Sequence, residues 1–291
     1  MLRLRTDQLR LVRADGTSSI LSTETREPGE LTTQDIFQVS PDGAYLAYIA
    51  NNALHLRAAD GSERTFDDYR GLMRFSPDAR DLAAAIAGHL QLVDLVYGTA
   101  RELTTLPMRQ LEWRRGGLVV LTTDSLIAVP LVGPQTIILD HASIERFVAA
   151  GTGTRVVAFV REPDVTRIVA FDGGRRAELG TSHDPTTNAA ASLDGTHVAF
   201  TTYQAVFAID RDAAPQPVAP ESYVHSVWYA RDGRLGYATA WATTIGGQRF
   251  PSNAGVNMLR FDPLTGDGLV AQANRLGLDH FAGGYVEWIV R

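Results

Sequence analysis

Short runs in which apolar and polar residues alternate dominate the chain, and the copy that begins at Phe37 shows their order clearly. The runs of this copy cover residues 37–39, 45–49, 54–58 and 63–66. Ser-Pro-Asp-Gly at 40–43 and Asp-Gly at 60–61 separate them. Side chains of a β-strand point alternately to opposite faces, so each run predicts a half-buried strand. Proline fixes φ and glycine accepts positive φ, so the turns predict antiparallel hairpins.

The same four-run unit recurs along the chain at a nearly constant spacing. In six copies the first turn contains a glycine or an alanine, at positions 43, 79, 116, 153, 195 and 233. Successive first turns are therefore 36 to 42 residues apart. A period of this length with four strands per unit is typical of the blades of a β-propeller.

The sixth copy departs from the pattern after its second run. Its third and fourth runs are expected only in NMLRFDPLTG (257–266) and GLVAQA (268–273). Residues 241–256, which follow the second run and precede these two late runs, then form an insertion with the sequence WATTIGGQRFPSNAGV.

The two ends of the chain each supply half a copy. Residues 2–21 match the back half of the Phe37 copy, and residues 280–291 match its front half. A blade built from both ends would close a ring and leave no free sheet edge. The sequence therefore predicts one all-β domain over 1–291, a seven-bladed β-propeller of four-stranded antiparallel blades whose N- and C-terminal strands share one blade.

The turn motifs carry a family resemblance. Ser-Pro-Asp stands at 40–42 and at 76–78, and a partial version begins at Ser192. Leu-Ala-Tyr at 46–48 and Val-Ala-Phe at 198–200 follow two of these turns. With these motifs the chain resembles TolB-like propellers, which are similar in architecture to WD-repeat propellers. The resemblance covers essentially the whole chain, and it implies the fold rather than a function.

Composition removes several classes of chemistry. All 27 basic side chains are arginine, which excludes Schiff-base catalysis and a phosphate-loop lysine. Cysteine is absent, so disulfides and thiolate metal sites are excluded as well. The net charge of −6 argues against nucleic acid as a partner, since duplex binding relies on basic surfaces. We expect no cofactor.

The cellular location follows from segments that the sequence lacks. The opening Met-Leu-Arg-Leu-Arg alternates like a strand and does not contain the apolar run of a secretory signal. No stretch approaches the roughly 18 apolar residues of a membrane helix. We expect a cytoplasmic protein without membrane insertion, or a periplasmic one whose leader has been removed.

Candidate partner-binding residues lie in the irregular segments. In the 241–256 segment, Trp241, Arg249 and Phe250 are of the types that dominate interface hot spots. The segment either contacts a partner or folds as a flap over neighbouring blades. Connections between blades add Tyr69, Arg70 and Tyr223. These residues favour a non-catalytic scaffold that binds a protein or peptide, as a component of a larger complex.

The alternative is a hydrolase, a lyase, or a sensor of a small ligand or metal at the channel mouth. It is motivated by the blade-connector histidines His141, His183, His225 and His280, which neighbour acidic residues. They either converge or remain separate solvated residues. Asp67 and Asp68 fit a solvated turn better than an acid–base pair. No Gly-x-Ser-x-Gly nucleophile elbow is present. We therefore assign no catalytic, cofactor-binding or metal-binding residue.

Overall fold

The structure, a computed structural model, describes residues 9–12, 18–22, 37–50, 53–219, 224–229, 233–239, 242–245, 248–251, 256–260 and 284–287. The chain divides into two compact units, which are Met1–Thr105 with Asn253–Arg291 and Leu106–Ser252. The first unit thus combines both ends of the chain. The described part of the chain contains no helix with the length and hydropathy of a membrane span.

The first unit contains two four-stranded antiparallel sheets. The first sheet consists of β3 (Phe37–Val39), β4 (Tyr45–Ala50), β5 (Ala53–Ala58) and β6 (Glu63–Phe66). The second sheet consists of β7 (Tyr69–Phe75), β8 (Asp81–Ile86), β9 (His89–Asp94) and β10 (Ala100–Thr104). In both sheets the strands pair in chain order, so each is an up-and-down meander, as the repeat predicts.

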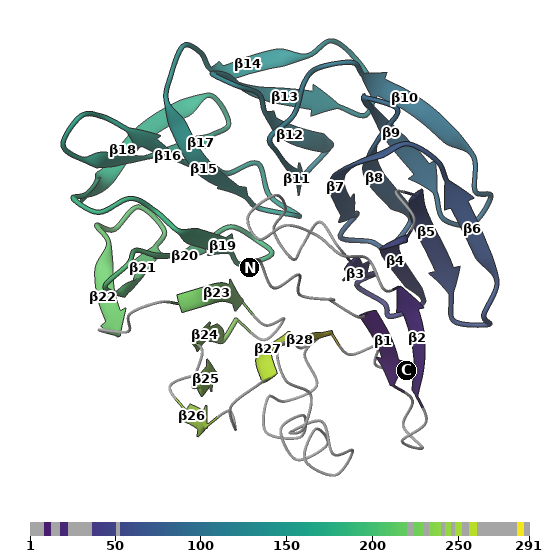
Figure 1. The fold of residues 1–291 in the computed structure, drawn as a ribbon. Coiled ribbons are helices and arrows are strands. Elements are labelled where there is room, and N and C mark those ends of the chain that lie inside the picture. The colour runs from purple at the N-terminus through teal and green to yellow at the C-terminus, as the bar shows by residue number, and fades with distance from the viewer. Residues whose placement is uncertain are drawn as a thin grey trace, which may run out of the picture. The chain divides into compact units, whose positions relative to one another are not determined.

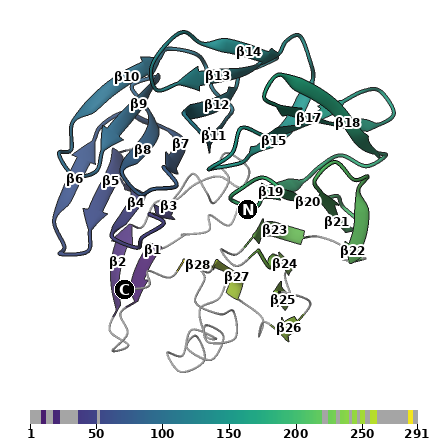
Figure 2. The ribbon, with the colours of Figure 1, turned by 180° about the vertical axis from the view of Figure 1, so that it is seen from behind.

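The second unit contains four sheets of the same kind. Their strands are β11 (Gln110–Arg114), β12 (Gly117–Leu121), β13 (Leu126–Pro130), β14 (Thr136–Leu139); β15 (Ile144–Ala149), β16 (Val156–Arg161), β17 (Thr166–Asp172), β18 (Arg175–Ser182); β19 (Asn188–Ala191), β20 (His197–Thr201), β21 (Val206–Asp210), β22 (Gln216–Ala219); and β23 (Val224–Tyr229), β24 (Leu235–Thr239), β25 (Ala242–Ile245), β26 (Gln248–Pro251). Within this unit the sheets follow one another in chain order in both face views (Figure 1, Figure 2).

Apolar side chains between neighbouring sheets form the core. In the first unit, Leu54 of β5 and Met73 of β7 belong to one buried cluster. In the second unit, Phe159 of β16 and Phe200 of β20 lie in another, with their ring centroids 5.2 Å apart. Within each unit, neighbouring sheets bury apolar faces against one another because alternate residues of their strands are apolar.

The sheet that begins at β23 corrects the predicted insertion. β25 pairs with β24, and β26 pairs with β25, so 242–251 supplies the third and fourth strands of this sheet. The interpretation of this segment as an insertion was wrong. Gly246-Gly247 between the two strands is a recognised two-residue hairpin signal.

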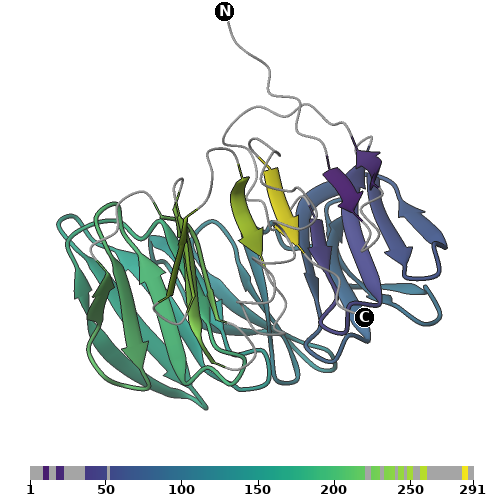
Figure 3. The ribbon, with the colours of Figure 1, turned by 90° about the horizontal axis from the view of Figure 1, so that it is seen from below.

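The strand after this sheet also pairs differently from the prediction. β27 (Val256–Arg260) lies parallel to β28 (Gly284–Glu287) and does not belong to the β23–β26 sheet. Figure 3 shows the two strands side by side. The other run predicted for the sixth copy, 268–273, lies outside the described residues.

The N-terminal half-copy forms the predicted hairpin. β1 (Leu9–Val12) pairs with β2 (Ser18–Ser22) in an antiparallel ladder. Among the described strands there are six four-stranded sheets, and no ladder joins the β1–β2 hairpin to β28. The architecture is therefore all-β, with repeated four-stranded antiparallel sheets.

Candidate interaction surface

The Ser-x-Asp turns are structural devices. In each, the serine hydroxyl donates to the aspartate Oδ1 two residues later, at 2.6 Å for Ser40–Asp42 and 2.7 Å for Ser76–Asp78 and Ser192–Asp194. The same hydroxyl accepts the backbone N–H five residues later, at 2.9 Å from Tyr45, Asp81 and His197. All three serines are buried. Their hydroxyls therefore fix the first hairpin of a sheet, which explains why the motif recurs.

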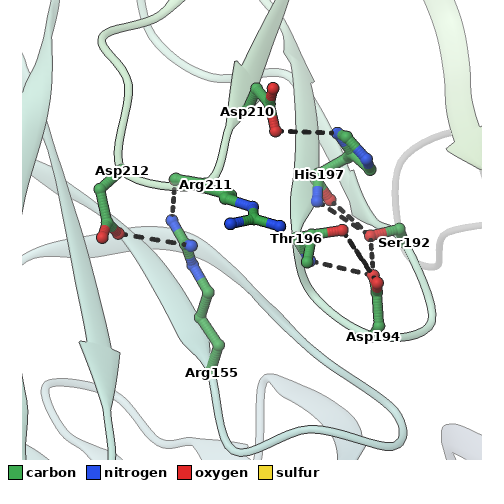
Figure 4. Close-up of polar contacts among 8 residues, drawn as sticks. All are labelled: Arg155, Ser192, Asp194, Thr196, His197, Asp210, Arg211 and Asp212. Atoms are coloured by element: carbon green, nitrogen blue, oxygen red, sulfur yellow. Dashed lines mark hydrogen bonds and ion pairs between the residues drawn. The ribbon is translucent and has the colours of Figure 1, made fainter.

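One of these turns brings together the residue types of a catalytic triad, as Figure 4 shows. The His197 ring meets Asp210, with 3.4 Å between Nδ1 and Oδ1. The Ser192 hydroxyl, however, contacts Asp194 and the backbone of His197 rather than the imidazole. A triad requires the ring to take the proton of the serine. The Ser192 hydroxyl is therefore not activated as a nucleophile.

The His197 ring instead belongs to a contact between two sheets. It lies 6.1 Å from the Tyr229 ring of β23, centroid to centroid. Burial, with a smaller contribution from the Asp210 carboxylate, raises the pKa of Tyr229 to about 12. The phenol is therefore a neutral packing group at ordinary pH.

Neighbouring sheets are also tied together at equivalent repeat positions. Arg155 donates to the carbonyl of Arg211 and lies 3.4 Å from Asp212 Oδ1 (Figure 4). Tyr45 donates from its hydroxyl to the carbonyl of Leu95, at 3.0 Å. Each donor stands two residues after a first-turn glycine, and each acceptor directly follows the third strand of the next sheet. The polar side chains of these turns therefore hold the repeat together.

The connection between the β11–β14 and β15–β18 sheets carries a second polar group. The Ser125 hydroxyl donates to Asp140 Oδ1 at 2.5 Å and to Asp124 Oδ1 at 3.1 Å. His141 lies beside both carboxylates, with 3.4 Å from Nε2 to Asp140 Oδ2 and 3.8 Å from Nδ1 to Asp124 Oδ2. The hydrogen bond from Ser125 is the main cause that lowers the pKa of Asp140. This group fixes the C-terminal end of β14 and leaves two carboxylates exposed there.

A half-buried carboxylate, that of Glu145, holds the next connection. Glu145 Oε2 accepts the backbone N–H of Thr186 at 3.0 Å and the Thr166 hydroxyl at 3.2 Å. Arg161 completes the group, with 3.8 Å between its Nε and Glu145 Oε1. These bonds hold the segment between β18 and β19 against the start of β15.

Three aspartates meet at one corner of the β7–β10 sheet. Asp81 stands directly opposite Asp94 across two strands, and Asp78 lies in the adjoining turn. Burial is the largest cause that raises the pKa of Asp81, and the charges of Asp78 and Asp94 add to it. The described residues contain no group of three or more histidine, cysteine or acidic side chains arranged to hold a metal ion.

Exposed apolar side chains occur mainly at hairpin turns and on outer strands. The large ones are Val96, Tyr97, Val132, Ile137, Leu193, Tyr203 and Val218. Val132 and Ile137 belong to one hairpin, the β13–β14 hairpin, with 91% and 59% of their surface exposed. We call Val132 together with Thr136–Leu139 the β14 edge.

The structure distributes the predicted partner-binding residues differently. Tyr69 is only 4% exposed and packs in the core between two sheets. Arg70 lies on β7, and Arg249 and Phe250 lie on β26. Trp241 and Tyr223 fall outside the described residues. Exposure of Val132 and Ile137 is set by tertiary packing. The local signal for Ile137 is the uncharged Thr-Ile-Ile-Leu run at 136–139 that contains it.

Two of the four histidines lie in connections between sheets, and a third lies on a strand. His141 is 84% exposed, and His183 is also exposed in the segment after β18. His225 lies on β23, and His280 falls outside the described residues. Convergence of all four around one ion stays an alternative beside four separate solvated residues.

Comparison with known proteins identifies the fold. The sequence matches no protein-family model, and it matches no curated protein. Among solved structures, Kluyveromyces lactis Hsv2 is similar over 72% of each chain, with a TM-score of 0.57 and 13% identity. Hydrazine synthase from Kuenenia stuttgartiensis is similar over 84% of this chain and 89% of its own, with a TM-score of 0.58 and 15% identity.

A third similar structure is streptogramin B lyase, which covers 81% of this chain and 85% of its own. Its TM-score is 0.54 and its identity 13%. At such identities the likeness concerns the fold alone, and two of the three proteins carry enzyme names, so the fold does not decide between binding and catalysis. The similar structures are β-propellers, and this chain has the fold of a β-propeller protein.

Proposed function

We propose that the chain is a non-catalytic, TolB-like β-propeller scaffold that holds a protein or peptide partner within a larger complex. The proposal rests on one observation: polar side chains around the turns bond within the turn instead of forming a reactive group. Ser192, His197 and Asp210 have the composition of a triad, yet the serine is bonded to backbone and to Asp194. Apolar tips such as Tyr97 and Val132 are exposed instead. Contact with a protein partner would bury these apolar side chains.

We further propose a single domain of seven blades over 1–291, with strands of both chain ends in the seventh. The β1–β2 hairpin and the β27–β28 pair supply four strands, and both belong to the unit that combines the two ends. Deletion of residues 1–22 should then expose sheet edges and cause aggregation. A soluble variant that unfolds at the wild-type temperature would contradict the shared blade.

The scaffold proposal is tested by quantitative co-purification. The tagged full chain, expressed in its source organism, should retain a specific partner at constant stoichiometry, in a complex larger than the free chain. Elution of the native chain as a free monomer would overturn it. The alternative is a hydrolase, a lyase, or a sensor of a small ligand or metal. Metal analysis tests its metal-binding form, for which about one bound equivalent of metal per chain is expected.

A further inference from the structure

The outer strand of each four-stranded sheet has an unpaired edge. Among the described strands, β6, β10, β14, β18, β22 and β26 each pair only with the third strand of their own sheet. Free N–H and C=O groups on such an edge can pair with another strand, and proteins suppress this with charged residues or proline.

Five of these six described edges carry that protection. Charged residues occur in β6, β10, β18 and β26, and prolines occur in β22 and β26. β14 reads Thr-Ile-Ile-Leu and has neither. A register shift interrupts the outer pairing of β10, β14, β18 and β22 alike, so this irregularity does not distinguish β14.

The β14 edge is both apolar and held in place. Ile137 is 59% exposed although it is a β-branched residue on a strand. Immediately after the strand, Asp140 is bonded to Ser125 of the β12–β13 hairpin, at 2.5 Å. A strand fixed in this way loses little conformational entropy when another strand pairs with it.

The size of the edge selects its occupant. Stable complexes of two folded proteins bury about 1,200–2,000 Å² in total. β14 has only four residues, so its edge favours a short extended segment over a second folded copy. Main-chain hydrogen bonds supply affinity in this kind of strand addition, and alternate side chains supply specificity.

Charged side chains near β14 determine which residue is favoured at one end of the bound segment. Asp124 and Asp140 expose their carboxylates at its C-terminal end, beside His141. An added antiparallel strand brings its N-terminal residue to this end. A basic residue there would face the two carboxylates, whereas an acidic residue would be repelled.

We propose that the β14 edge binds an extended segment of a partner protein as an added antiparallel strand, with β-branched residues preceded by arginine or lysine. The inference rests on the proposed scaffold function and names the chemistry of its partner.

Fluorescence anisotropy with the full chain and a labelled probe peptide, Arg-Thr-Val-Thr-Val-Thr, tests the inference. We expect saturable binding that weakens about tenfold with Ile137→Lys, because the lysine places a charge on the edge. Val218→Lys is the matched control, since Val218 lies on β22 and is 49% exposed. Thr136→Lys provides a second edge variant should Ile137→Lys fail to fold.

Two further comparisons test the chemistry. A probe with proline in place of both valines should not bind, because it lacks two N–H donors and proline interrupts a strand ladder. A probe with glutamate in place of arginine should bind more weakly, and Asp124→Asn should reduce that difference. Failure of the wild-type chain to bind the first probe would overturn the inference, as would equal binding by Ile137→Lys.

The remaining outcomes separate this inference from the proposed function. If Ile137→Lys retains the partner recovered by co-purification, the scaffold stands and the β14 edge is not its site. Dimerisation in sedimentation experiments that Ile137→Lys abolishes would assign the edge to a second copy and overturn the peptide as occupant.

Discussion

Asp194→Ala tests the view that the Ser-x-Asp turns stabilise the fold. Asp194 accepts the Ser192 hydroxyl at 2.7 Å, the Thr196 N–H at 3.0 Å and the Thr196 hydroxyl at 2.8 Å. Alanine removes all three acceptor contacts without altering the backbone hydrogen bond from Gly195 to Ser192. The serine and threonine donors then depend on water.

The pKa of Asp194 sets the expected size of the effect. The hydrogen bond from Ser192, followed by those from Thr196, lowers this pKa from 3.8 to about 2. Full conversion of that difference would give roughly 2.5 kcal/mol, at about 1.36 kcal/mol per pKa unit. Because the carboxylate is exposed, solvent screening reduces the expected loss in the free energy of unfolding to about 1 kcal/mol.

The pH dependence gives a sharper test than the magnitude. A lowered pKa in the folded state means that the carboxylate contributes its full stabilisation above its ordinary pKa. The contribution is lost as the pH falls from about 4 toward 2. Wild type and Asp194→Ala should therefore differ at pH 7 and converge at low pH.

Urea unfolding at pH 7, 4, 3 and 2 measures both quantities. Asp164→Ala is the matched control, because Asp164 is an exposed turn carboxylate with no polar contact assigned among the described residues. A loss below about 0.3 kcal/mol at pH 7 would refute the stabilising role of the turn, as surface substitutions commonly fall within about 0.5 kcal/mol. A difference between wild type and Asp194→Ala that stays constant with pH would refute its electrostatic origin.

Three further substitutions test other parts of the structure by urea unfolding. Asp81→Asn should stabilise the fold by about 0.5 kcal/mol at pH 7, since Asp81 has a raised pKa and faces like charges. The gain should vanish below the ordinary aspartate pKa. A variant less stable than wild type at pH 7 would contradict the repulsion argument. Gly195→Ala should cost about 1 kcal/mol more than Gly233→Ala. Both glycines have positive φ, but only at Gly195 would the added Cβ overlap a neighbour; equal losses would contradict the packing argument. Gln110→Ala should cost about 2 kcal/mol, because the Gln110 amide pairs with both the N–H and the C=O of Phe147; a loss below 0.5 kcal/mol would show that water replaces the amide.

Local signals explain how much of the fold could be predicted. Ser40–Gly43 and its relatives determine hairpins through bonds between residues at most five apart, so the motif is readable without the rest of the protein. The period of the first turns then predicts the sheets, and the structure confirms repeated four-stranded antiparallel sheets.

The prediction failed where strand pairing depends on the rest of the fold. Ala242–Ile245 has weak alternation, and its place as a third strand is decided by pairing with β24. Val256–Arg260 pairs with Gly284–Glu287, which lies more than 20 residues away in the chain. Burial of Tyr69 likewise depends on packing between two sheets.

The sequence by itself determined the repeated hairpins, the exclusion of lysine and cysteine chemistry, and the all-β class, because these follow from composition and short-range contacts. Tertiary structure alone decided that the His197 ring lies beside the Tyr229 ring of β23, and that Ile137 remains exposed. Both are outcomes of where strands distant in sequence come to lie. Side-chain direction and solvent exposure are set by that arrangement, and no local pattern encodes them.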